Sequence, residues 1–244
     1  MKIALAAVGF ITNDIAYNLS KIEEVVKKYR DKADMILFGE SFIQGFDCLS
    51  WDYSRDIDIA LGKDSKSIKR IRSICKEYDT ALSVGYIEKY KDRIYSSQIT
   101  LDKNGEILNN FRRVSKGWKE SIADDHYSEG DSFIKFEYMG KVLSIGLCGD
   151  LWYEENCRKM KKLDLDLVFW SVYTDFNYEE WNKNLKYEYA DQAKKFCDQV
   201  LYVNSYCIDG ASDDIARGGA AFFKDGQIKA EIPSGKEGVL VIEV

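Results

Sequence analysis

Nearly continuous apolar runs alternate along this chain with stretches in which apolar residues recur at helical spacing. Residues 2–10 and 33–38 are mostly apolar, as strands are when both faces of their sheet are covered. Between them, apolar positions return every three or four residues, which predicts a helix capped by Thr12 or Asn13. The first forty residues therefore predict a strand–helix–strand unit.

The same patterns predict further elements downstream. Helices are expected at 65–78 and 181–196, and strands at 81–88, 93–102, 106–111, 133–138, 141–147, 163–172, 199–205 and 238–244. The connection 41–63 is long and includes Trp51 and Tyr53, so it is a candidate wall of a pocket. Strands that alternate with helices and hairpins indicate an α/β chain with a mixed sheet. This pattern alone does not separate three layers from four.

Length and charge narrow the class of protein. A chain of 244 residues fits one larger domain over 1–244, with ample length for a full core. A net charge of −6 argues against nucleic acid or an anionic membrane as partner. No apolar run approaches the ~18 residues of a membrane span. The apolar opening soon reaches the polar residues 12–14, so we interpret it as a strand and not a signal peptide.

The cysteines and the single histidine limit the kinds of metal site and catalytic site that the chain can form. The 6 cysteines are scattered without Cys-x-x-Cys pairs in a large domain, which favours reduced thiols and a cytoplasmic location. With His126 as the only histidine, a zinc site of the ordinary Cys/His type is improbable. We therefore expect no metal and no cofactor. A cysteine mechanism based on a glutamate needs no histidine.

One cysteine comes directly after a predicted strand. Residues 142–147 are mostly apolar, Cys148 follows, and Gly149-Asp150 leads into a helix-like segment through Met160. A thiol on a sharp strand-to-helix turn is held on rigid backbone near helix N-terminal amides, which favour the thiolate. Cys148 is therefore a candidate nucleophile, although an isolated cysteine is more commonly a buried structural residue.

A carboxylate ends another apolar strand. The predicted strand 33–38 finishes at Gly39-Glu40, which places the charge of Glu40 at an edge of the sheet. Burial there would raise its pKa toward the range that is useful for a general base. The simpler interpretation is a solvated glutamate that follows a strand.

Two stretches together resemble the nitrilase (carbon–nitrogen hydrolase) superfamily. Residues 144–155 are similar to its nucleophile motif, an apolar strand running into Cys, then Asp and shortly Glu. Residues 35–46 are similar to its strand ending in Pro-Glu, with Gly39 in place of the proline and Glu40 at the general base. The resemblance extends from Lys2 to the C-terminus. It implies a four-layer αββα sandwich of two mixed sheets and a homodimer or larger homo-oligomer.

The third catalytic residue of that family is a lysine, and here the sequence departs from the pattern. Phe111 and Arg112 align with the family's Tyr-Arg, which puts Arg113 where the lysine belongs. Lys116 and Lys119 lie three and six residues farther on, and either ammonium is a candidate to reach the site. We favour Lys119, because residues 117–118 (Gly-Trp) give the loop a bend and an anchor.

These alternatives make different geometric predictions. If Arg113 has replaced the lysine, its guanidinium must point into the site beside Cys148 and Glu40. Strand alternation then puts residues 111, 113 and 115 on one face and residues 112 and 114 on the other. If a loop lysine has taken over, Arg113 should pair with a carboxylate such as Asp124. Residues 124–131 also resemble the family's Glu-x-x-Tyr-x-x-Gly stretch, which puts Asp124 in the place of a supporting acidic residue.

The resemblance implies a hydrolase of non-peptide carbon–nitrogen bonds that acts on a small-molecule amide or nitrile, with an amide favoured. Cys148 would be the nucleophile and Glu40 the general base. Two other classes remain open at this stage. One is a catalytically silent relative that binds a small molecule or partner, suggested by Arg113. The other is a Cys148–His126 hydrolase or a thiol redox protein.

Overall fold

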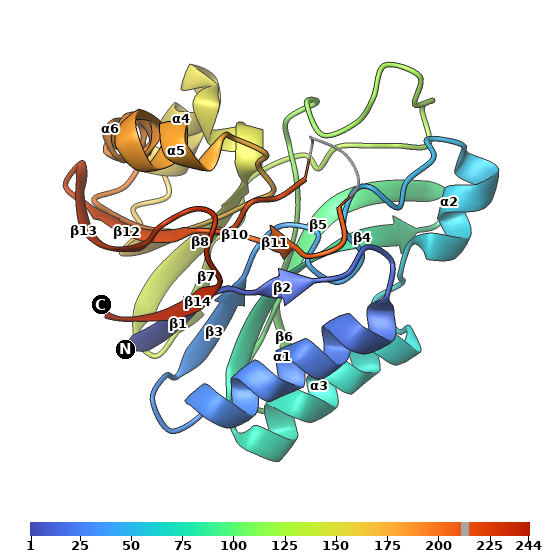
Figure 1. Ribbon diagram of the computed structural model, residues 1–244, viewed down its shortest axis with the longest axis horizontal. Coiled ribbons are helices and arrows are strands. Elements are labelled where there is room, and N and C mark those ends of the chain that lie inside the picture. Colours follow the sequence, from blue (N-terminus) through green and yellow to red (C-terminus); the bar gives the residue numbers. More distant parts are fainter. Residues whose placement is uncertain (211–214) are drawn as a thin grey trace.

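Two six-stranded mixed sheets form the centre of the computed structural model, which describes residues 1–210 and 215–244 (Figure 1). The first sheet contains, in spatial order, β14 (Gly238–Glu243), β1 (Lys2–Ala7), β3 (Met35–Phe38), β4 (Ala81–Tyr90), β5 (Arg93–Leu101) and β6 (Ile107–Arg112). Its three central strands, β1, β3 and β4, are parallel, and the other pairings are antiparallel.

The second sheet repeats this plan. It contains β13 (Gln227–Ile232), β12 (Ala220–Lys224), β10 (Gln199–Asn204), β9 (Leu167–Val172), β8 (Lys141–Leu147) and β7 (Phe136–Tyr138). Here β8, β9 and β10 are parallel. A separate short pair joins β2 (Gly9–Phe10) to β11 (Tyr206–Cys207). The central strands of both sheets are buried along nearly their whole length, which explains their apolar sequences.

Helices cover the outer face of each sheet. On the first sheet lie α1 (Ile15–Tyr29) and α3 (Lys66–Tyr78), with α2 (Tyr53–Ile59) in the long connection. On the second lie α4 (Glu154–Lys161), α5 (Tyr178–Glu180), a π-helical turn (Trp181–Leu185) and α6 (Lys186–Ala193). Apolar side chains of α1 and α3 pack on one sheet and those of α4 and α6 on the other. The predicted four-layer αββα sandwich is confirmed.

The sequence placed most elements correctly and misjudged several ends. The cap of α1 is neither Thr12 nor Asn13: Asp14 accepts a hydrogen bond from the Tyr17 amide at 2.9 Å. Asn13 instead has φ +56° and donates its amide to the Gln44 carbonyl, so the helix begins one residue later. The predicted strand 163–172 is shortened to β9, because Asp164 has φ +53° and interrupts the extended backbone.

Two further features bear on the sequence predictions. The predicted helix 181–196 begins earlier, at Tyr178, and contains the π-helical turn. Within residues 1–210 and 215–244, every helix is too short or too polar to cross a bilayer.

Candidate active site

Glu40 and Cys148 lie at the carboxyl ends of strands from different sheets. Glu40 follows β3 by two residues and is fully buried, and Cys148 follows β8 directly. The Glu40 amide donates to the carbonyl of Val172, the last residue of β9, at 3.2 Å. The Ser205 hydroxyl donates to the Glu40 carbonyl, also at 3.2 Å. These bonds tie the turn after β3 to the second sheet, so the two candidate residues meet where the sheets face each other.

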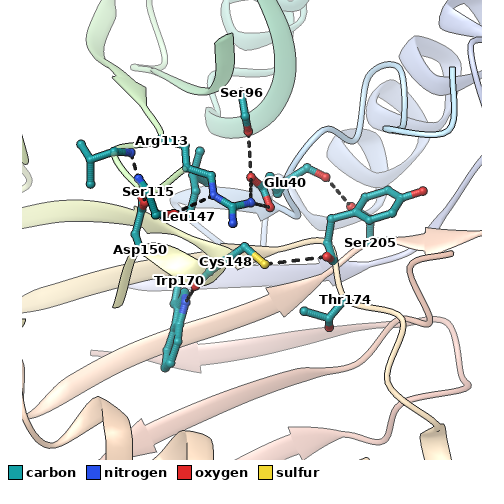
Figure 2. A network of polar contacts seen from close by, with 12 residues as sticks. Glu40, Ser96, Arg113, Ser115, Leu147, Cys148, Asp150, Trp170, Thr174 and Ser205 are labelled. Atoms are coloured by element: carbon teal, nitrogen blue, oxygen red, sulfur yellow. Dashed lines mark hydrogen bonds and ion pairs between the residues drawn. The ribbon is translucent and has the colours of Figure 1, made fainter. Parts of the chain in front are cut away.

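Arg113 brings the positive charge into this region. It follows β6 directly, is 4% exposed, and donates from Nη1 to Glu40 Oε1 at 3.1 Å (Figure 2). Its Nε donates to the Ser115 hydroxyl at 3.0 Å. Burial works against the charged form, but the Glu40 carboxylate, with smaller contributions from Cys148 and Asp150, raises the pKa of Arg113 above its usual range. The guanidinium is therefore a permanent buried cation.

The strand alternation that places Arg113 is as predicted. Phe111, Arg113 and Ser115 are buried, whereas Arg112 points to the opposite face. There Arg112 makes two hydrogen bonds of 2.8 Å to the buried carboxylate of Glu88. The two adjacent arginines therefore serve separate carboxylates on the two faces of the first sheet.

Ser96, on β5, gives Glu40 a second partner. Its hydroxyl donates to Glu40 Oε1 at 2.7 Å, and both side chains are buried. The carboxylate thus accepts hydrogen bonds from a neutral group, Ser96, and from a cation, Arg113. Together these bonds fix the orientation of Glu40, as a proton-transferring group requires.

Cys148 has an unusual backbone conformation. Its φ is +40°, a region that residues other than glycine seldom adopt. The Trp170 indole donates to the Cys148 carbonyl at 2.8 Å, and the thiol lies 3.8 Å from the Tyr173 carbonyl (Figure 2). This sharp turn is the start of a 3₁₀ helix, Cys148–Trp152, that precedes α4. The predicted strand-to-helix turn is present.

The expectation that this turn favours the thiolate is wrong for the free protein. Burial raises the pKa of the Cys148 thiol to about 11, against the lowering effect of the Arg113 guanidinium, and the Glu40 carboxylate raises it further. Desolvation by two packed sheets outweighs the nearby amides. The thiol is protonated near neutral pH, so a base must remove its proton before it can attack.

The other predicted site residues lie elsewhere. Lys119 Nζ donates to the Tyr127 carbonyl at 2.6 Å and forms an ion pair with Glu129 at 2.9 Å. Lys116 is exposed. The Asp124 side chain is 55% exposed and its Oδ1 lies 3.0 Å from His126 Nδ1. Among the described residues, none of these groups contacts Glu40, Arg113 or Cys148, and Arg113 pairs with Glu40 where the loop-lysine hypothesis expected Asp124.

The histidine is likewise engaged away from the cysteine. The His126 ring stacks on Tyr53 with centroids 3.9 Å apart. With Asp124 as its other neighbour, it forms part of an exposed loop. In the described part of the chain, no contact joins it to Cys148, so the geometry gives no support to a Cys148–His126 pair.

The long connection 41–63 contributes aromatic side chains near the cysteine. Phe46 packs edge-to-face on Tyr173 with centroids 5.2 Å apart, and Tyr173 is the residue whose carbonyl the thiol approaches. Trp118 lies next in this row, 6.2 Å from Phe46, and Trp51 follows at 6.0 Å from Trp118. These rings form a row that begins at Tyr173 and continues away from the thiol into a small apolar cluster with Leu49 and Ile87.

Three polar residues of this cluster were not predicted as site residues from the sequence. Ser96 holds Glu40, Ser115 holds Arg113, and Asp150 accepts hydrogen bonds from the amides of the two residues that follow Arg113. Serines at inward positions of strands are common, and nothing local distinguishes Ser96. The sequence could have indicated Asp150, because this residue stands two positions after Cys148 within the nucleophile motif.

The chain is similar to several characterised proteins. It is 22% identical over 242 residues to the glutamine-dependent NAD(+) synthetase of Acinetobacter baylyi, covering 97% of this chain and 42% of that protein. It is 23% identical over 168 residues to an (R)-stereoselective amidase of Pseudomonas sp., covering 69% and 58%. The chain thus spans about half the length of these curated relatives.

Solved structures share the fold over the whole chain. The amidase from Nesterenkonia sp. AN1, with acrylamide added to its active-site cysteine, superposes with a TM-score of 0.80 at 18% identity, covering 100% of this chain and 93% of that one. A glutamine-dependent NAD+ synthetase from Acinetobacter baumannii gives 0.77 at 20% identity, covering 98% and 44%. The carbon–nitrogen hydrolase family model matches residues 2–244, and the chain therefore belongs to that family.

Proposed function

We propose that this protein hydrolyses the carbon–nitrogen bond of a small-molecule amide, with Cys148 as nucleophile, Glu40 as general base and Arg113 as the catalytic cation. The observation that carries the proposal is the meeting of a buried carboxylate, a buried guanidinium and a thiol at the ends of three strands. Amide hydrolysis needs these three groups: a nucleophile, a proton carrier and a positive charge for the developing anion.

The first half of the reaction forms a thioester. Glu40 takes the thiol proton as the Cys148 sulfur bonds to the carbonyl carbon, and the carbonyl oxygen becomes an oxyanion. The carbon–nitrogen bond then breaks, and the nitrogen leaves as ammonia or an amine with the proton that Glu40 returns. Because the thiol pKa is about 11, proton removal and attack are coupled, and a base held at the site is essential.

The second half releases the acid. Glu40 takes a proton from water, the resulting hydroxide attacks the thioester carbon, and the carbon–sulfur bond breaks. The sulfur receives the proton back from Glu40, which restores the starting state and leaves a carboxylic acid product. Both halves pass through an oxyanion that needs the same donors.

Arg113 is well placed for that oxyanion. A Cβ added to Gly149 would lie 2.9 Å from Arg113 Nη2, so this nitrogen lies beside the residue that follows Cys148. The Gly149 amide and Arg113 Nη2 are the two donors that we assign to the oxyanion. Removal of one such donor typically costs about 10²–10³ in rate.

The names of the relatives support an amide substrate. They include the Pseudomonas amidase, the N-carbamoylputrescine amidase of Oryza sativa at 23% identity, and the Nesterenkonia amidase whose cysteine carries acrylamide. An amide is therefore favoured over a nitrile. A cytoplasmic location and a homo-oligomer remain predictions, and light scattering tests the second.

One alternative has a specific observation in its favour. Arg113 stands where the family has lysine, and its ion pair with Glu40 engages the proposed base. A catalytically silent protein that binds a small molecule in the same place would show this arrangement. Ammonia release from an amide separates the hydrolase from the silent binding protein.

The test is a screen for ammonia release from short aliphatic amides, ω-amidated dicarboxylates, N-carbamoyl amino acids and nitriles. We expect turnover of at least one amide by the wild type, none by Cys148→Ala, and a kcat/KM lower by at least about 10² for Glu40→Gln. His126→Ala serves as the matched control and should retain full activity. No turnover across the panel, or full activity in Cys148→Ala, would overturn the proposal.

A further inference from the structure

Asp150 is a fully buried carboxylate to which the proposed mechanism gives no part. Its Oδ1 accepts hydrogen bonds from the amides of Ser115 at 2.7 Å and Val114 at 3.1 Å. Its Oδ2 accepts from the Leu147 amide at 3.0 Å. One side chain therefore joins the segment after β6, in the first sheet, to the turn that carries Cys148, at the end of β8 in the second (Figure 2).

This contact continues to the guanidinium. Ser115, whose amide Asp150 holds, accepts a hydrogen bond from Arg113 Nε at 3.0 Å. Arg113 Nη1 is bound to Glu40, and Nη2 lies beside Gly149. Each of the three guanidinium nitrogens thus has a defined place: one on Ser115, one on the base, and one toward the residue that follows Cys148.

We propose that Asp150 is a positioning residue for Arg113, which acts through Ser115 to hold the guanidinium between Glu40 and the turn at Cys148. The inference rests on the proposed function and assigns a residue outside its three catalytic groups. An arginine needs such a device more than a lysine, because its planar fork directs each nitrogen differently and a rotation of the plane misplaces all of them. A misplacement of about 1 Å can lower a rate by about 10².

The ionisation of Asp150 should control how firmly Ser115 and Arg113 are held. Burial raises the pKa of Asp150 to about 6, against the lowering effects of the Arg113 guanidinium and of the amide and hydroxyl donors. The charged or titratable groups around it are Arg113, which directly follows β6, the Cys148 thiol on its own turn, and Glu40 beyond Arg113. Above about pH 6 both carboxylate oxygens accept hydrogen bonds. Below it one oxygen carries a proton, so it can no longer accept its amide contacts equally well.

The predicted consequence is an acid limb in kcat near pH 6 that belongs to Asp150. Activity should be full above this pH and should fall as the pH decreases through it, because the protonated side chain loosens Ser115 and with it Arg113. Activity should fall toward acid, and not toward base, because the ionised form of Asp150 is the one that positions the Arg113 guanidinium.

The experiment measures kcat and KM from pH 5 to 9, with the best amide of the screen, for the wild type, Asp150→Asn, Ser115→Ala and the double variant. We expect Ser115→Ala to lower kcat by about 10-fold and Asp150→Asn by about 10- to 100-fold, with KM nearly unchanged. Asp150→Asn should also lose the acid limb. In the double variant, kcat should fall by a smaller factor than the product of the factors in the two single variants, because both residues act through the same chain of contacts.

Asp166→Asn is the matched control. The Asp166 carboxylate also accepts a backbone hydrogen bond, from the Val142 amide at 2.8 Å, at the opposite end of β8. It should leave kcat and the acid limb unchanged. If Asp150→Asn does not fold, as judged by circular dichroism, Ser115→Ala decides, because it removes only a hydroxyl.

Three outcomes would overturn the inference. They are a wild-type kcat in folded Ser115→Ala, an unchanged acid limb in Asp150→Asn, and a change in KM with kcat preserved. Loss of all activity in Cys148→Ala together with any of these would leave the proposed hydrolase standing and remove only the role of Asp150. An inactive wild type would instead refute the proposed function.

Discussion

At the scale of single residues, the buried ion pair between Glu40 and Arg113 defines the charge of the proposed site. A lysine is a compact charge on a flexible stem, whereas an arginine is a rigid fork that stays charged at any accessible pH. Here the fork donates hydrogen bonds to Glu40 and Ser115, and its Nη2 lies beside Gly149. The positive charge near Cys148 therefore does not titrate.

The identity of the cation is tested by two substitutions. Arg113→Lys keeps a positive charge, but its single ammonium cannot reach Glu40, Ser115 and the neighbourhood of Gly149 together, so we expect kcat to fall by at least about 10² with the fold retained. Lys119→Met removes a cation that is bound to Tyr127 and Glu129, and kcat should change by less than about 2-fold. The opposite pattern in steady-state kinetics, with Lys119→Met costly and Arg113→Lys silent, would return the role to the loop lysine.

The thiol gives a prediction of pH dependence that needs no substrate. Since the pKa of Cys148 is raised from 9.0 to about 11, its thiolate fraction should increase about tenfold per pH unit through the neutral range. Alkylation of Cys148 by iodoacetamide, followed by intact mass, should accelerate up to at least pH 10. Cys148→Ala identifies the signal among the other cysteines. A rate already maximal at pH 8 would show that the thiol is activated at rest.

At the scale of elements, the turn after β3 depends on close contact with β4. A Cβ added to Gly85, on β4, would lie 2.4 Å from the Ser41 amide nitrogen and 2.6 Å from the Cα of Glu40. Ser41 itself has φ +51°. The backbone that carries the proposed base is thus pressed directly against its neighbouring strand, and only a glycine allows this approach.

Gly85→Ala should therefore affect stability and activity together. The added methyl group must displace backbone, which we expect to cost about 1–3 kcal/mol and to shift Glu40. Gly62→Ala is the control, because a Cβ there has no atom within 4 Å. Urea denaturation and ammonia release are the two measurements. Equal stability and activity in the two variants would show that β4 does not support the turn.

At the scale of the whole molecule, the site depends on the packing of one sheet on the other. Strand β1 packs on β10 and β12, and the fully buried Leu5 belongs to the cluster that joins the sheets. Glu40 and Arg113 come from one sheet and Cys148 from the other. The apolar packing between the sheets therefore stabilises the geometry of the proposed site as well as the fold.

Leu5→Ala tests this dependence. Removal of a buried leucine side chain typically costs about 2–5 kcal/mol, so the free energy of unfolding in urea should fall by that amount. Val241→Ala, on the neighbouring strand β14, removes a side chain that is 37% exposed and should cost less than about 1 kcal/mol. Similar losses for both would place the main stabilising contacts outside the layer between the sheets.

The sequence by itself predicted most of the strands and helices and indicated Glu40 and Cys148 as candidate site residues. Apolar runs and helical spacing depend on burial within each element, so they predicted the strands and the helices without knowledge of their neighbours. Cys148 directly follows such a run and Glu40 comes two residues after another, and the resemblance to the nitrilase superfamily then indicated a role for each. The strand alternation around Arg113 was also predicted, since it depends only on the period of two.

Only the tertiary structure decided how these groups meet. Arg113 pairs with Glu40, whereas Lys119 pairs with Glu129, and this one sequence carries no signal for contact between distant segments. The parts played by Ser96, Ser115 and Asp150 became visible for the same reason. The raised pKa of Cys148 arises from burial between two packed sheets, a property of the assembled layers and of no single element.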